Sequence, residues 1–128
     1  MILGIGVDLV EVARIEQAIE RHGDAFLHRI FTADEFAWCS KMKSPSPHFA
    51  ARFAAKEAVS KAFGTGIGAQ LGWLDIEVLR DDTGKPSVVL HGSGAIFAES
   101  RGVQAIHLSL SHTATFAVAQ VVVEGDDI

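Results

Sequence analysis

The sequence has one cysteine, three prolines and no tyrosine among its 128 residues. The single Cys39 excludes an internal disulfide framework and a zinc site built from several cysteines. Long apolar runs are also missing, and even the run at 116–123 contains the polar Gln120. A membrane helix needs about 20 apolar residues, so we expect none here. The first residues carry no basic segment, so we expect no secretory signal. These absences predict a cytoplasmic protein that has no membrane as partner.

Positive charge is scarce over the whole chain but concentrated in its middle. The formal net charge is −5, from 11 Lys and Arg against 16 Asp and Glu, and aromatic residues make up 8%. This balance disfavours nucleic acid as a partner. Between positions 36 and 74 the only acid is Glu57, and the cations are Lys41, Lys43, Arg52, Lys56 and Lys61. Such a tract is expected either to bind an anion or to form a solvated helix face.

The hydrophobic pattern predicts an α+β fold in a single domain that spans residues 1–128. Hydrophobic residues make up 48% of the chain, which is enough for one substantial core. A buried first strand is expected at 2–10, and Thr32 with Glu35 forms a capping-box pattern. We also expect helices at 11–22, 33–41, 48–63 and 93–101, a helical turn at 25–30, and strands at 75–80, 87–91, 104–111 and 115–123. This order predicts an antiparallel-rich sheet packed against several helices.

Two further segments are expected to be irregular. Ser44-Pro45-Ser46-Pro47 is predicted to be a loop between two helices, because prolines interrupt helical runs. The acidic residues 124–128 are predicted to form a frayed tail. Neither segment is long enough to separate two cores.

Asp8 is the first candidate for chemistry. It lies near the end of the apolar first strand, two residues after Gly6, where a backbone or ligand can approach closely. A carboxylate in such a place needs an ion pair, hydrogen bonds or a metal. The alternative is that it caps the following helix. The glycines at 4 and 6 do not form the G-x-G-x-x-G motif of dinucleotide-binding proteins, because Leu9 occupies the position of the third glycine.

The second candidate is one face of the predicted helix at 48–63. Glu57, Ser60, Lys61 and Gly64 follow the spacing i, i+3, i+4, i+7, opposite a stripe of alanines. A carboxylate beside a hydroxyl and cations can hold a metal–phosphate group. The alternative is an ordinary surface pair between Glu57 and Lys61.

The third candidate is the end of the strand at 104–111. Leu108 and Leu110 alternate with serines, so one face of the strand is apolar and the other carries hydroxyls. Ser111, His112 and Thr113 stand at its end, either as site residues or as a polar turn. Ser111 and His112 cannot form a catalytic dyad, because neighbours in a strand point to opposite faces.

Together these segments resemble the 4′-phosphopantetheinyl transferases. The matching motifs are Gly6-Val7-Asp8, the run FAAKEAVSK at 53–61 and the run LSLSH at 108–112, and the likeness extends over roughly residues 1–123. The length, the first residues and Phe53 are similar to the small bacterial class. The resemblance implies Mg²⁺-dependent transfer of the phosphopantetheine arm of coenzyme A to a serine of apo acyl carrier protein. The by-product is adenosine 3′,5′-bisphosphate, and the pathway is fatty acid biosynthesis in lipid metabolism.

The resemblance also implies roles for single residues. Asp8 and Glu57 would bind the metal, and Lys61 would contact the phosphate under attack. The implied coenzyme A contacts are Arg52, Lys56, Ser60, Gly64, Lys85, Pro86, Ser111, His112 and Thr113. Val10 stands where the larger class has a third carboxylate, so water is expected there. The small class implies a homotrimer with active sites between subunits.

A docking surface for the acidic carrier protein is expected on the first helix. Arg14 and Arg21 lie seven positions apart with Ala18 between them, and Phe26 or Arg29 would assist. The alternative is that both arginines are simply solvated. A rival function is a non-catalytic nucleotide-binding module that uses the same cationic helix and the glycine loop after it.

Overall fold

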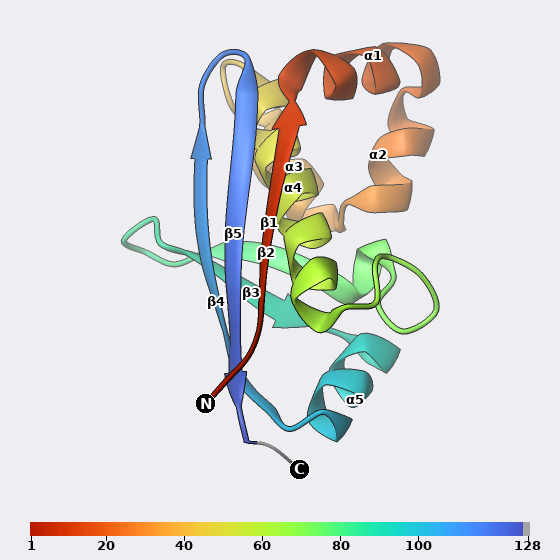
Figure 1. Cartoon of the computed structure of the whole chain (residues 1–128). Helices are drawn as coiled ribbons and strands as arrows, with labels where there is room; N and C mark the ends of the chain where they lie inside the picture. Colours follow the sequence, from red (N-terminus) through yellow and green to blue (C-terminus); the bar gives the residue numbers. More distant parts are fainter. Residues whose placement is uncertain (127–128) are drawn as a thin grey trace.

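Helix α4 (Pro45–Phe63) is the element around which the rest of the chain is arranged (Figure 1). The computed structural model describes residues 1–126. On one side of α4 lies a three-stranded sheet, and on the other lie the remaining helices and a two-stranded hairpin. The elements before α4 are β1 (Ile2–Glu11), α1 (Val12–His22), α2 (Asp24–Ile30) and α3 (Ala33–Ser40). After it come the 3₁₀ turn η1 (Trp73–Asp75), β2 (Ile76–Arg80), β3 (Pro86–Leu90), α5 (Gly92–Ser100), β4 (Val103–His112) and β5 (Phe116–Gly125).

Both sheets are antiparallel, which confirms the predicted α+β class. The larger sheet has the order β1-β5-β4, so the last strand lies between the first and the fourth. Asp8 pairs with Ala119 in this sheet, and Ala119 pairs in turn with Leu110. The smaller sheet is the hairpin of β2 and β3. No helix within residues 1–126 has the length and apolar character that crossing a membrane requires.

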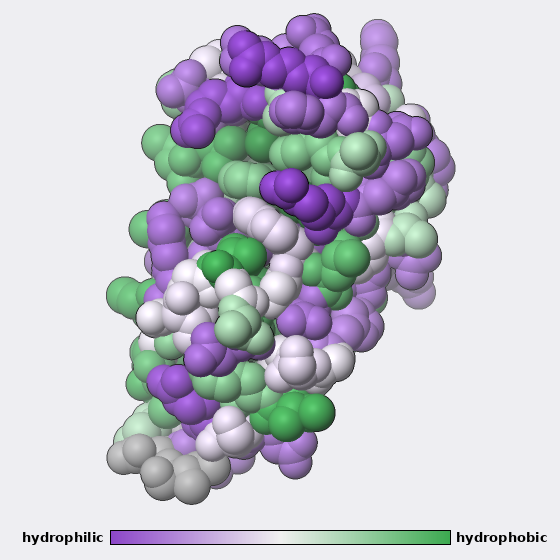
Figure 2. Space-filling model, turned by 90° about the vertical axis from the view of Figure 1, so that its right-hand side faces the viewer, coloured by the Kyte–Doolittle hydropathy of each residue, from purple (hydrophilic) through white to green (hydrophobic). Residues whose placement is uncertain are grey.

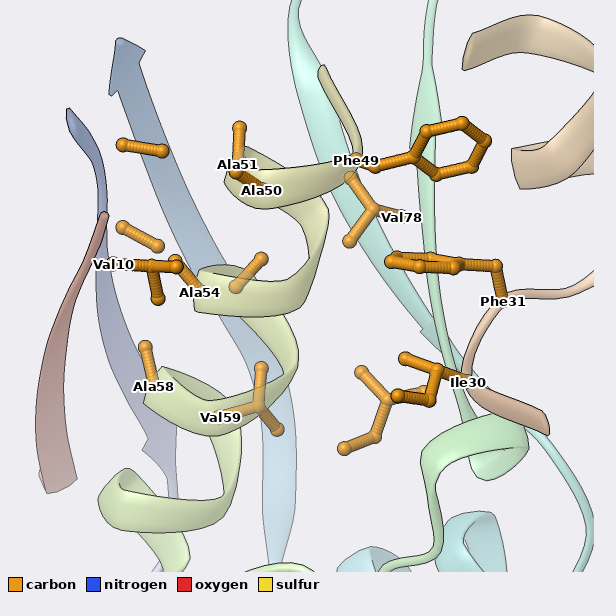
Figure 3. Close-up of a cluster of buried hydrophobic side chains, with 14 of the residues drawn as sticks. Val10, Ile30, Phe31, Phe49, Ala50, Ala51, Ala54, Ala58, Val59 and Val78 are labelled. Atoms are coloured by element: carbon orange, nitrogen blue, oxygen red, sulfur yellow. The ribbon is translucent and has the colours of Figure 1, made fainter. Parts of the chain in front are cut away.

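The core lies on both sides of α4, as Figure 3 shows. Alanines of the helix, including Ala54 and Ala58, face the sheet and Val10, whereas Phe49 and Val59 point toward Phe31 and its neighbours. Small side chains on the sheet side let the helix and the sheet approach closely. The consequence is that α4 is buried almost all round.

Two glycines of β1 make this close approach possible. A Cβ atom at Gly6 would overlap the backbone oxygen of Ala58, and one at Gly4 would overlap that of Ala62. Asp8 follows Gly6 on the same side of the strand, because alternate residues of a strand share a face. The glycines therefore bring the carboxylate of Asp8 to the surface of α4.

Three details correct the sequence predictions. The first strand is buried on one face only, since Ile5, Val7 and Leu9 are exposed. The two prolines at 45 and 47 belong to the first turn of α4, where a missing backbone N–H costs nothing. The predicted frayed tail begins too early, because β5 continues to Gly125. Residues 127–128 of that tail lie outside the described residues.

Substitution of Gly6 by alanine is expected to destabilise the fold by about 2 kcal/mol or more, because the added methyl group meets backbone that cannot move aside. Urea denaturation measures this change in the free energy of unfolding. Gly68→Ala is the control, because a Cβ atom there meets nothing within 4 Å. If the two variants are equally stable, the proposed close packing of α4 on β1 is wrong.

Candidate functional site

Asp8 and Lys61 meet where β1 passes the last turns of α4. The Nζ atom of Lys61 lies 2.8 Å from Oδ1 of Asp8 and 3.1 Å from the carbonyl oxygen of Val7. The Asp8 side chain is mostly covered, whereas half of the Lys61 side chain is exposed. The structure thus joins two of the three predicted catalytic residues from distant parts of the sequence.

Glu57, one turn before Lys61 on α4, completes this group. Burial raises the pKa of Glu57, the negative charge of Asp8 raises it further, and Lys61 opposes both effects. The two carboxylates are therefore close enough to repel each other. One ammonium group does not fully compensate two partly desolvated carboxylates, so the site favours an additional cation.

A pocket of about 440 Å³ opens beside these carboxylates. Its polar wall contains Asp8, Glu57 and Arg14, and its apolar wall contains Ile15, Phe26 and Phe53. Helix α1 supplies Arg14 and Ile15, so the predicted docking helix borders the site directly. Figure 2 views the side of the molecule with α1 and α2 and shows apolar surface directly beneath the hydrophilic top. Such a pocket can hold a chain that is polar at one end and apolar along its length.

The donor set fits Mg²⁺. Within residues 1–126, no group of three or more His, Cys, Asp or Glu side chains is placed to hold a metal ion, and the carboxylates that share this pocket are Asp8 and Glu57. Proteins usually hold Mg²⁺ with one or two carboxylates, while water and substrate phosphates supply the remaining oxygens. Val10, where the larger class has its third carboxylate, is buried in the core.

Lys56 does not face a ligand, and this corrects its predicted role. Its side chain is fully buried, and Nζ lies 2.7 Å from Oε1 of Glu35. Nζ also donates to the carbonyl oxygens of Trp73, at 2.9 Å, and Ile76. An ammonium group has three donors, and all three are used inside the protein. The coenzyme A contact came from the position of Lys56 in the family motif, and motif position does not show that a side chain is accessible.

The other predicted residues of α4 differ in exposure. The hydroxyl of Ser60 is buried and donates to the carbonyl oxygen of Glu57, at 2.7 Å, so it presents no donor to a ligand. Gly64 is exposed and ends the helix in the left-handed conformation, with φ of 76°. Of the predicted face, Glu57, Lys61 and Gly64 therefore remain accessible.

Arg52 belongs to a second cluster, near the start of α4. Its guanidinium lies 4.0 Å from the ring centre of Trp38, and the guanidinium of Arg80 approaches the same ring to 5.1 Å. The His48 ring packs against Trp38 and, at 4.9 Å between centroids, against His112. Burial, together with the charges of His112, Arg52 and Arg80, lowers the pKa of His48.

This cationic cluster has unused hydrogen-bonding atoms. Nε of Arg52, Nε of Arg80 and Nδ1 of His48 are buried without a partner among residues 1–126. Buried polar atoms normally find partners, so three of them beside one indole ring favour an anionic ligand. Sequence reasoning identified Arg52 and His112 but missed Trp38, His48 and Arg80, which no motif connects.

The single chain keeps the two clusters apart. Asp8 lies on β1 and His112 on β4, which are the two edges of the sheet, with β5 between them. Two strand spacings amount to roughly 10 Å. The remaining predicted contacts lie in different places. Ser111 and Lys85 are exposed, and Pro86 is the first residue of β3. The Thr113 hydroxyl accepts a hydrogen bond from the backbone N–H of Phe116 within its own turn. None of these reaches the Asp8 pocket.

Comparison with known proteins assigns this architecture to a class. Residues 4–121 match the sequence profile of the 4′-phosphopantetheinyl transferase superfamily. The chain therefore belongs to this superfamily, which confirms the resemblance seen in its three motifs.

Within the superfamily, the chain is similar to proteins named holo-[acyl-carrier-protein] synthase. The one from Koribacter versatilis is 50% identical over 124 residues, covering 97% of this chain and 99% of that protein. The crystal structure of the Neisseria meningitidis synthase has a TM-score of 0.91 at 36% identity, covering 97% of this chain and 99% of that chain. The Bacillus anthracis synthase, in complex with CoA (3′,5′-ADP), has a TM-score of 0.82 at 43% identity, covering 98% and 99%.

Proposed function

We propose that this chain, acting as a single domain, transfers the 4′-phosphopantetheine group of coenzyme A to a serine of apo acyl carrier protein. The convergence of Asp8, Glu57 and Lys61 beside a half-apolar pocket carries this proposal. Similar chains named holo-[acyl-carrier-protein] synthase, two of them in complex with coenzyme A or its nucleotide part, support it. The product would serve fatty acid biosynthesis in the cytoplasm.

The reaction needs positioned charge more than covalent chemistry. The serine oxygen forms a bond to the β-phosphorus of coenzyme A, the bond to the leaving adenosine 3′,5′-bisphosphate breaks, and the serine proton is released. Asp8 and Glu57 would hold Mg²⁺, which when bound neutralises charge on the pyrophosphate oxygens. Lys61, whose ammonium group is exposed, can donate to a phosphate oxygen as negative charge develops.

The cationic cluster is the proposed site for the nucleotide end of coenzyme A. Arg80 is partly exposed, and its guanidinium and that of the buried Arg52 both approach the Trp38 ring, against which His48 also packs. Arginine suits phosphate because its donors match two phosphate oxygens at once. This assignment keeps the predicted roles of Arg52 and His112 and gives Trp38 and His48 new ones.

The outer face of the large sheet supports a homotrimer. Ile5, Val7 and Leu9 on β1 and Phe116 on β5 are exposed, with Val118 and Val122 partly exposed beside them. A row of large apolar side chains on one sheet face is typical of a surface that another chain covers. Contact between copies through this face would bring the Asp8 pocket of one chain toward the His112 edge of another, as interfacial active sites require.

The carrier protein is proposed to dock on α1 and α2. Arg14 and Arg21 are exposed on α1, and Arg14 also borders the Asp8 pocket. A second, smaller hollow beside them is lined by His22, Ala25, Phe26 and Arg29. Cations around a partly exposed phenylalanine suit an acidic helical partner with an apolar centre.

Mass spectrometry of apo acyl carrier protein, incubated with the chain, coenzyme A and Mg²⁺, tests the transferase activity. We expect the carrier to gain the mass of phosphopantetheine, whereas the rival nucleotide-binding module would leave it unchanged.

Glu57→Gln is expected to lower kcat by about a hundredfold or more, because the metal site loses one of its two charges. Glu99→Gln, on the exposed part of α5, is the matched control. Full activity of the Glu57 variant would contradict the proposed site.

Arg14→Glu is expected to raise the KM for acyl carrier protein about fivefold or more while leaving the KM for coenzyme A unchanged, because an attraction becomes a repulsion. Steady-state kinetics at low and high salt measure both constants. Arg101→Glu introduces the same charge change at the end of α5, away from α1. If both variants bind the carrier equally well, α1 is not the docking surface.

Val7→Glu is expected to convert the trimer to monomers, because it places like charges within the proposed contact between copies. Sedimentation velocity measures the mass of the assembly. Val89→Glu, at an exposed valine of β3, is the control and is expected to remain trimeric. A monomeric wild-type protein, or a trimeric Val7 variant, would refute the sheet-face interface.

A further inference from the structure

The ion pair of Lys56 and Glu35 is completely buried in the part of the chain that the structure describes. Neither side chain has any accessible surface. The Glu35 carboxylate also accepts the backbone N–H groups of Thr32 and Val78, each at 2.8 Å. Together with the bonds from Lys56 to Trp73 and Ile76, the pair ties α3, α4, η1 and β2 to one point.

Stability alone gives no reason for this pair. Removing two charges from water costs about as much as their attraction returns, and apolar residues of similar volume often replace such pairs without loss. Burial lowers the pKa of Lys56, and the charge and hydrogen bond of Glu35, followed by the charge of Glu77, act against this effect. An ion pair forms directional bonds, whereas an apolar contact does not. These bonds select one arrangement of the helices.

The arrangement selected here concerns the residue next to Lys56. Successive helix residues are separated by about 100° of rotation, so fixing the direction of Lys56 also fixes the direction of Glu57. On the opposite side of α4, the glycine contacts with Ala58 and Ala62 set the distance to β1. The packing of its other buried faces also constrains α4, and the ion pair adds directional bonds that hold the rotation of the helix on the side away from β1.

We propose that Lys56 and Glu35 are positioning residues for Glu57: their buried ion pair fixes the rotation of α4 at which Glu57 faces Asp8. This inference rests on the proposed two-carboxylate metal site. Neither residue touches a substrate. Their effect reaches the reaction through the direction of the Glu57 carboxylate, much as outer hydrogen-bonding partners orient the ligands of other metal sites.

The test is the double variant Glu35→Gln/Lys56→Met, which removes both charges together and leaves neither unpaired. Its kcat is expected to fall about tenfold or more, with the KM for coenzyme A unchanged. Mn²⁺, which binds to the same oxygen ligands as Mg²⁺, gives a readout independent of turnover. Titration followed by the electron paramagnetic resonance of free Mn²⁺ is expected to show an affinity loss of about tenfold or more.

Val78→Ala is the matched control for a purely structural role. It removes buried apolar volume beside the pair but keeps the backbone N–H that Glu35 accepts. All assays are made well below the Tm of each variant. If the control lowers kcat and Mn²⁺ affinity as much as the double variant does, or if the double variant keeps wild-type values, the positioning role is refuted.

Lys56→Arg covers the case in which the double variant does not fold. It keeps a positive charge opposite Glu35 but changes the direction of the donors, so the same losses of kcat and Mn²⁺ affinity are expected. Wild-type values in this variant would refute the inference. Failure of the wild-type protein to bind Mn²⁺ would instead refute the metal site itself, together with the inference that rests on it.

Discussion

The close contact between β1 and α4 is the constraint on which the rest of this structure depends. Gly4 and Gly6 have no side chains, so the helix backbone rests directly on the strand. An acid on the strand and an acid on the helix can then share one cavity wall. Any larger residue at either glycine would move the helix outward, and the pocket would lose one of its charged walls.

Much of the fold was predictable because it follows local rules. Periodicity and end signals predicted the order of helices and strands, and the capping box of Thr32 and Glu35 is present. Asp8, Glu57 and Lys61 were singled out together only through the family resemblance, since each motif alone left a structural alternative open, and the fold brings the three residues to one place. The one-sided exposure of β1 was missed because an apolar strand with one exposed face can have the same composition as a strand buried on both faces.

Features that need tertiary contacts could not be predicted. The resemblance implied a coenzyme A contact for Lys56, and nothing in its neighbours along the chain reveals the ion pair with the distant Glu35. The cluster around Trp38 joins α3, α4 and the ends of β2 and β4, so no spacing within the sequence connects its members. The division of the proposed site between the two sheet edges follows from strand order, which periodicity does not specify.

The central place of β5 in the large sheet has a consequence for how the chain acquires its structure. The first strand hydrogen-bonds to β5 and to no other strand within residues 1–126, so its partner is synthesised almost a full chain length later. During translation, the backbone of β1 has no strand partner until residues 116–125 emerge, although α4 can cover its inner face earlier. Pairings between such distant segments form slowly, because a long loop must close first. Completion of the large sheet therefore has to wait until residues 116–125 are available.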